Sequence, residues 1–102
     1  MNRLELLQSL VEQNPTESFA RYGLAMELKH SGRLDDAVAQ FMQLLEHNPG
    51  YAAGYFHCAQ TLEKLDRLDD ARGLYRRGIE AASAAGDDHA AAEMQAALDL
   101  LG

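Results

Sequence analysis

The chain has no tryptophan, one cysteine and only two prolines among its 102 residues. The single cysteine, Cys58, excludes an internal disulfide bond. Runs rich in Val, Ile and Thr, which are typical of β-strands, are almost missing. No segment approaches the roughly 20 consecutive apolar residues that a membrane-spanning helix needs. Glu5 and Glu12 interrupt the first apolar segment, whereas the apolar segment of a secretory signal is uninterrupted. We therefore expect a cytoplasmic protein with no membrane contact.

Positive charge is also scarce. Nine Lys and Arg residues face sixteen Asp and Glu residues, which gives a formal net charge of −7, and only two of the nine are Lys. This charge opposes association with phosphate backbones, so we expect no nucleic-acid partner. What the chain does contain is abundant alanine and leucine, which favour helix, within a 47% hydrophobic composition. Length and composition therefore predict one all-α domain.

A repeat of 34 residues runs through the sequence. Asn14-Pro15 recurs as Asn48-Pro49, and residues 33–37 (Arg-Leu-Asp-Asp-Ala) recur as residues 67–71. Repeats of this length indicate helix pairs that cannot bury their apolar faces alone and do so by stacking on their neighbours.

The spacing of apolar residues predicts six helices, over about residues 2–13, 16–30, 34–47, 51–65, 68–84 and 87–101. Thr16 is the expected N-cap of the second helix. Gly32 and Gly86 fit the left-handed backbone that commonly ends helices. We assign residues 2–13 to an N-terminal half repeat, 16–49 to repeat 1, 50–85 to repeat 2 and 87–101 to a C-terminal capping helix.

The repeat resembles the tetratricopeptide repeat (TPR), whose signature is an aromatic, then Leu-Gly and Tyr, then Ala-x-x-x-Phe and Pro. The first repeat matches at Leu24, Ala25, Leu28, Ala37, Phe41 and Pro49, with Arg21 where the aromatic is usual. The second matches at Tyr55, Cys58, Ala59, Leu62, Ala71 and Tyr75, with Ser83 in place of proline. The resemblance covers nearly the whole chain and implies a right-handed superhelix of antiparallel helix pairs.

In this family the first helix of each repeat lines a groove that holds a peptide or helix of a partner protein. The resemblance implies eight groove residues here: Phe19, Tyr22, Met26, Lys29, Phe56, His57, Gln60 and Lys64. It also places Gly23, His30, Ala53, Glu63, Ala92 and Ala96 on this face. Aromatic and Met side chains that lie off the packing stripe favour apolar contacts, so we predict a largely apolar groove. Packing against the neighbouring helix explains Tyr22, Met26 and Phe56 equally well.

One TPR subfamily clamps the C-terminal carboxylates of its partners with Lys and Asn side chains. Tyr22, Met26 and His57 stand at three of those positions here, so we predict that the groove is not a carboxylate clamp.

Three Asp-Asp pairs and four histidines have simpler explanations than catalysis or metal binding. Asp35-Asp36, Asp69-Asp70 and Asp87-Asp88 each open a predicted helix and fit a capping role. The histidines lack the spacing of metal ligands, and no nucleophile or phosphate-loop motif is present. We therefore predict no metal site, no cofactor and no catalytic residue.

An arginine cluster, Arg72, Arg76 and Arg77, is expected to face solvent, with Arg76 able to pair with Glu80. The leading hypothesis is a protein–protein interaction module, an adaptor or scaffold and not an enzyme. The alternative is a structural protein that associates with itself as a homo-oligomer, through the groove or through the leucines of its end helices.

Overall fold

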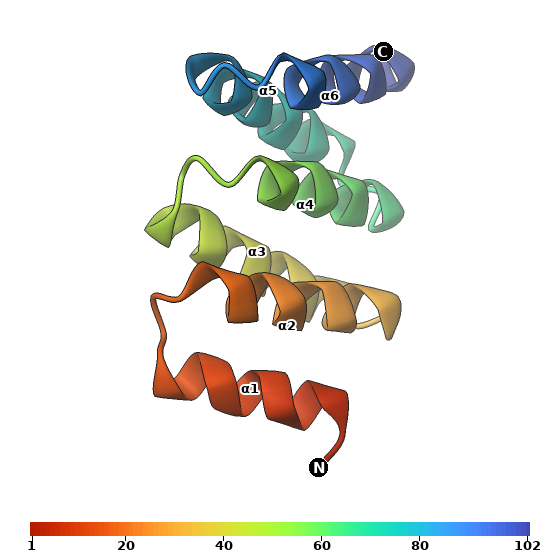
Figure 1. Cartoon of the computed structure of the whole chain (residues 1–102). Helices are drawn as coiled ribbons and strands as arrows, with labels where there is room; N and C mark the ends of the chain where they lie inside the picture. The colour runs from red at the N-terminus through yellow and green to blue at the C-terminus, as the bar shows by residue number, and fades with distance from the viewer.

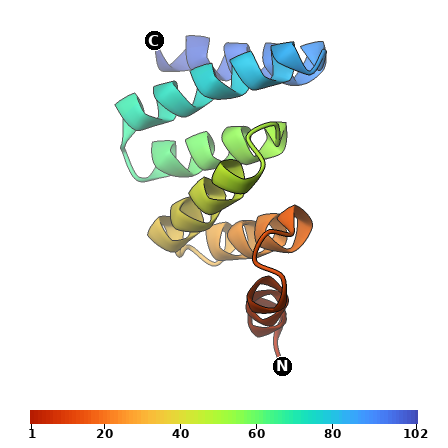
Figure 2. The same ribbon diagram turned by 90° about the vertical axis from the view of Figure 1, so that its left-hand side faces the viewer.

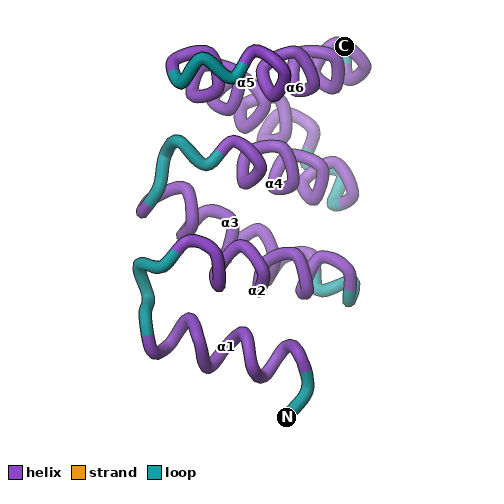
Figure 3. The backbone as a smooth tube through the Cα atoms, in the orientation of Figure 1, coloured by secondary structure: helices purple, strands orange, loops and turns teal.

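The computed structural model describes all of residues 1–102, which form six α-helices and no strand (Figure 1, Figure 3). The helices are α1 (Arg3–Gln13), α2 (Ser18–His30), α3 (Leu34–His47), α4 (Ala52–Lys64), α5 (Leu68–Ala84) and α6 (Asp88–Leu101). Each begins and ends within two residues of its predicted bounds. None of the six combines the length and hydropathy that a membrane crossing requires.

The helices stack in chain order, with the two termini at opposite ends of a body of 41 × 29 × 18 Å (Figure 1, Figure 2). Each helix packs on its neighbours in the sequence, and α4 also contacts α2 and α6. These three helices therefore form one layer, which lies in front of α3 and α5 in Figure 1. We call its outer surface the α2–α4–α6 face.

The turns that end α2, α4 and α5 share one hydrogen-bonding pattern. After α2, the Arg33 amide donates to the Leu28 carbonyl, and the Gly32 amide donates to the Lys29 carbonyl. This pattern satisfies carbonyls that the helix end leaves without partners, and it requires a left-handed residue. Gly32 has φ +80° and Gly86 has φ +76°, which confirms the predicted left-handed geometry. Asp66 fills the same place after α4 with φ +59°, a backbone that Asp tolerates better than most residues.

Two capping predictions were wrong. The N-cap of α2 is Glu17, not Thr16, because the Glu17 carboxylate accepts from the Phe19 and Ala20 amides at 2.9 and 2.7 Å. Of the three acidic pairs, only that of α6 supplies a cap, where Asp87 accepts from the Ala90 amide. The other two pairs, at the starts of α3 and α5, lie in the first turn without a capping hydrogen bond. There they still oppose the positive end of the helix dipole.

The arginine cluster of α5 is only partly a solvated surface. Arg72 donates to the carbonyls of Leu101 and Gly102, so it binds the C-terminal end of α6. Arg77 lies over the Tyr55 ring, 5.5 Å from its centroid. Arg76 is exposed and forms no ion pair, so the predicted pairing with Glu80 was wrong.

Arg21 stands where the TPR signature has an aromatic residue, and it makes a hydrogen bond equivalent to that of Tyr55 in the second repeat. In the second repeat the Tyr55 hydroxyl donates to the Pro49 carbonyl at 2.6 Å. In the first repeat, Arg21 Nη2 donates to the Pro15 carbonyl at 2.9 Å. Donor and acceptor each lie 34 residues before their counterparts in the second repeat. Both side chains are buried, and both tie a helix to the end of the preceding helix.

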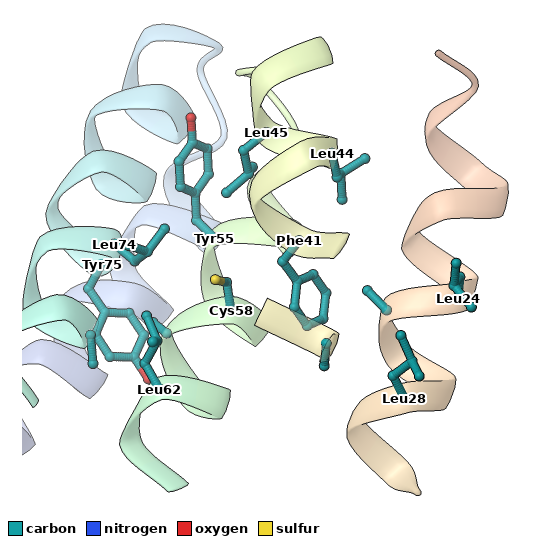
Figure 4. Packing of buried hydrophobic residues seen from close by; sticks show 14 of the residues in the cluster. Leu24, Leu28, Phe41, Leu44, Leu45, Tyr55, Cys58, Leu62, Leu74 and Tyr75 are labelled. Atoms are coloured by element: carbon teal, nitrogen blue, oxygen red, sulfur yellow. The ribbon is translucent and has the colours of Figure 1, made fainter. Parts of the chain in front are cut away.

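A single apolar cluster joins the six helices. Ala25, Ala37, Ala59 and Ala71 are fully buried, and small residues at these positions let each helix pair approach closely. Phe41 and Tyr75 are the large residues that fill the centre of each repeat (Figure 4). Cys58 is also buried in this cluster, as its position predicts. The core thus repeats in the same register as the sequence.

Candidate functional site

Seven of the eight predicted groove residues lie along two stripes on neighbouring helices. Tyr22, Met26 and Lys29 are spaced by four and three residues on α2. Residues at such spacing share one side of a helix. Phe56, His57, Gln60 and Lys64 do the same on α4, one helix further along the α2–α4–α6 face. The two stripes touch each other through the contacts described next.

Aromatic rings form a continuous row across this face. The Tyr22 ring contacts Tyr51 and His57, with centroid distances of 5.3 and 6.0 Å. His57 contacts Phe56 at 5.5 Å, and Phe56 contacts the buried Tyr75 ring at 6.2 Å. Edge-on and tilted pairs at these distances are favourable for aromatic rings. All the rings of the row except Tyr75 are half-buried, so each combines packing with an accessible edge.

A polar cluster lies beside the aromatic row. Lys29 is only 8% exposed, and its Nζ donates to His57 Nδ1 at 3.2 Å and to Gln60 Oε1 at 3.0 Å. Burial lowers the pKa of His57, and the positive charges of Lys29 and His30 lower it further. His57 is therefore suited to accept this hydrogen bond as a neutral ring. Burial also lowers the pKa of Lys29, and the nearby charge of Lys64 adds to the effect.

A pocket of about 450 Å³ opens between α4 and α6. Its lining is mostly apolar and consists of Ala52, Ala53, Phe56, His57, Asp87, Ala90, Glu93 and Met94. Pockets of this size can take a ligand group or an apolar side chain of a partner. The two carboxylates give one side of the pocket a negative charge.

Sequence analysis placed three lining residues, Ala53, Phe56 and His57, on the groove face, but it did not predict that they border a pocket. The pocket depends on the position of α6 relative to α4. That position follows from α5, which is 17 residues long where α3 has 14. The missing proline at Ser83 signals the extension but not the shape that results.

Two predicted residues lie elsewhere. Phe19 is 78% exposed and lines a separate pocket of about 280 Å³, together with Leu7 and Leu10 of α1. Gly23 was wrongly expected on the α2–α4–α6 face. A Cβ atom added there would lie 3.1 Å from Leu7 Cδ2, so Gly23 faces α1.

No group of three or more His, Cys, Asp or Glu side chains is placed to hold a metal ion.

Phe19, Leu6 and Leu10 together leave apolar surface exposed at the N-terminal end of the stack. The α2–α4–α6 face is thus one of two surfaces with the properties of a contact site.

Comparison with known proteins agrees with the architecture. The family model described as tetratricopeptide repeat matches residues 28–98. No curated protein matches the chain at a significant level. The solution structure of a tetratricopeptide repeat domain protein from Salinibacter ruber is 36% identical, with a TM-score of 0.81, over 86% of this chain and 89% of that one.

The descriptions of two further structures mention binding of a peptide or protein. YrrB, described as a TPR protein with an unusual peptide-binding site, is 27% identical with a TM-score of 0.79, over 90% of this chain and 46% of that one. PcrH, solved with the chaperone-binding region of PopD, has a TM-score of 0.90 over 96% of this chain and 74% of that one. At 19% identity, the likeness to PcrH shows the fold alone.

Proposed function

We propose that this chain, which belongs to the tetratricopeptide repeat family, binds a peptide or helix of a partner protein on its α2–α4–α6 face. The family is a protein-interaction fold and generally non-catalytic, which supports a role as an interaction module. We further assign the binding site to this face and infer that it is largely apolar. YrrB, a protein with a peptide-binding site, supports the peptide as the class of ligand.

The single observation that carries the proposal is the pocket between α4 and α6 next to the aromatic row. Phe56 belongs to both, since its ring lines the pocket and also contacts His57 and Tyr75. Removing such apolar surface from water contributes about 25 cal/mol for each Å² buried, so one Leu or Met side chain in the pocket gains about 1.5–3 kcal/mol. A peptide that spans pocket and row would add further contacts of the same kind.

Ala53 offers a test that leaves the core intact. Its side chain is exposed and lines the pocket, so Ala53→Glu adds bulk and charge where the ligand would lie without removing a buried group. The matched control is Ala39→Glu, also an exposed alanine within a helix, but on α3. Random peptides displayed with a blocked C-terminus are selected on the wild-type protein, and the affinity of the winning peptides is measured by fluorescence anisotropy.

The expected result is that Ala53→Glu weakens these peptides tenfold or more, a loss of at least about 1.4 kcal/mol, while Ala39→Glu leaves them unchanged. Equal affinity for both variants contradicts the assignment of the face. Circular dichroism of both variants shows whether each keeps the helical fold.

Self-association is the second candidate, and the exposed apolar surface at the N-terminal end favours it. Leu6 and Leu10 of α1 are 48% and 41% exposed, and Phe19 lies near them at the adjacent pocket. Light scattering behind a sizing column at several concentrations measures the mass in solution. A mass that rises with concentration and falls back to the monomer in Leu10→Glu assigns this end to a homo-oligomer. A constant monomer mass removes this candidate.

A further inference from the structure

We propose that the partner segment carries an acidic side chain, Asp or Glu, that binds at Lys29 and Lys64 on the α2–α4–α6 face. This inference rests on the proposed function and specifies the chemistry of its ligand. The occupant is an internal acidic residue of the peptide, which distinguishes it from a C-terminal carboxylate.

The distribution of positive charge is the first reason. The chain has only two lysines, and the two are near enough for the charge of Lys64 to lower the pKa of Lys29. Neither lysine has a carboxylate within ion-pair distance. By contrast, the ion pairs of Arg3, Arg33, Arg67 and Arg72 satisfy four of the arginines within the chain. Arg21, Arg76 and Arg77 also form no ion pair, so what distinguishes the two lysines is that they lie together on the α2–α4–α6 face.

The burial of Lys29 is the second reason. Its ammonium is held by two neutral acceptors, His57 and Gln60, which satisfy hydrogen bonds but not the charge. A buried charge without an opposite charge is unfavourable, and a carboxylate brought by a ligand would relieve it. Glu27 pairs with Arg3 and Glu63 accepts from the Tyr75 hydroxyl, so neither carboxylate forms an ion pair with a lysine.

Lysines at helix ends have a simpler explanation, because cations in the last turn oppose the negative end of the helix dipole. That explanation suffices for Lys64, which is exposed in the last turn of α4. It does not suffice for Lys29, because the ammonium of Lys29 bonds to side chains of α4 and not to the end of its own helix.

The charge on this face is separated along α4. The pocket near Ala53 has the carboxylates of Asp87 and Glu93, while the lysines lie at the other end of α4. Ala53 and Lys64 are eleven residues apart, so the two ends are roughly 16 Å apart along the helix axis. An acidic residue would be repelled at the pocket and attracted at the lysines. In an extended peptide, about five residues should therefore separate the apolar anchor from the acid.

The peptides selected on the wild-type protein supply the probe. Their blocked C-termini leave side chains as the only source of carboxylate. We expect Asp or Glu to be enriched at a fixed separation from the apolar anchor. The winning peptide and its Glu→Gln (or Asp→Asn) twin are then compared on the wild-type protein. The twin should bind about tenfold more weakly, which is the size expected of one hydrogen-bonded charge pair.

Two variants that each replace one lysine by an uncharged residue, together with a matched control, locate the contact. Lys64→Gln and Lys29→Met should reduce the difference between the two peptides to threefold or less, because the carboxylate then lacks its cation. Arg76→Gln is the control, because it changes the net charge equally at an exposed residue on α5 that has no ion pair. It should preserve the tenfold difference.

Three outcomes are possible. The inference is supported if the acidic peptide binds more tightly than its amide twin only when both lysines are present. Selected peptides that are weakened by Ala53→Glu, but that show no acidic preference or keep it when the lysines are replaced, overturn the inference and leave the proposed function standing. If no selected peptide is sensitive to Ala53→Glu, the proposed function and the inference fail together.

Discussion

Gly78 of α5 has the tightest surroundings of the eight glycines. A Cβ atom added at Gly78 would lie 2.6 Å from Tyr55 Cβ on α4 and 2.4 Å from Met94 Sδ on α6. Ordinary contacts between carbon atoms are about 3.5–4.0 Å, so α4 or α5 would have to move by about 1 Å. Tyr55 Cβ is attached directly to the backbone and cannot turn aside. Gly78→Ala therefore forces a displacement of a helix and not of a side chain alone.

The size of the effect follows from two opposing contributions. Overpacking of a well-packed core costs about 1–3 kcal/mol, and this site, crowded on both sides, belongs at the upper end. Replacing glycine by alanine within a helix gains about 1 kcal/mol. Overpacking at about 3 kcal/mol, less the gain of about 1 kcal/mol from helix propensity, should lower the free energy of unfolding of Gly78→Ala by about 2 kcal/mol.

Gly73, five residues earlier in α5, provides a matched control. A Cβ atom added there meets nothing within 4 Å. Gly73→Ala should therefore raise the free energy of unfolding by about 0.5–1 kcal/mol through helix propensity alone. Urea unfolding followed by circular dichroism measures both variants against the wild type. If Gly78→Ala is as stable as Gly73→Ala, then α4, α5 and α6 do not pack as closely as described, and the reasoning is refuted.

Three further predictions concern single side chains. Burial raises the pKa of the Cys58 thiol to about 12, so iodoacetamide at pH 8 should label the native protein far more slowly than the urea-unfolded chain, and equal rates would show that Cys58 is accessible. Because the pKa of His57 is lowered in the fold, the unfolded chain binds a proton first as the pH falls through about 6.5, and the free energy of unfolding should decrease from there downwards. His57→Gln should reduce this decrease in urea titrations at pH 7.5 and 5.5, and an unchanged decrease would show that His57 is not its source. Arg21→Leu should lower the free energy of unfolding by about 1–3 kcal/mol because the Pro15 carbonyl loses its donor. Arg21→Tyr should lose less, since tyrosine fills this position in the second repeat; an equal loss for both variants would mean that the hydrogen bond contributes little.

Local patterns were enough to predict the six helices. The left-handed Gly32 and Gly86 and the run from Leu68 to Ala84 reflect interactions within a few residues, which sequence spacing reports directly. The 34-residue period added that the helices pair and stack in two equivalent repeats. The N-cap of α2 was missed because Thr is the more usual N-cap residue, whereas α2 begins at Ser18 and the Glu17 carboxylate accepts from its first-turn amides.

The surface was predictable only in part. Helical spacing was enough to group Tyr22 with Met26 and Lys29, because that grouping depends on one helix. The burial of Lys29 depends on the distance between α2 and α4, and the pocket depends on where the length of α5 places α6. Such relations between helices leave no periodic signal in the sequence.

The most direct test of the central claim is a map of the amide chemical shifts of the isotope-labelled protein during titration with the tightest peptide from the selection. The proposal predicts that the perturbed amides concentrate on α2, α4 and α6, around Tyr22, Phe56, His57 and Met94. Perturbations confined to α3 and α5, or to α1 and the region of Phe19, would contradict it and place the binding surface elsewhere.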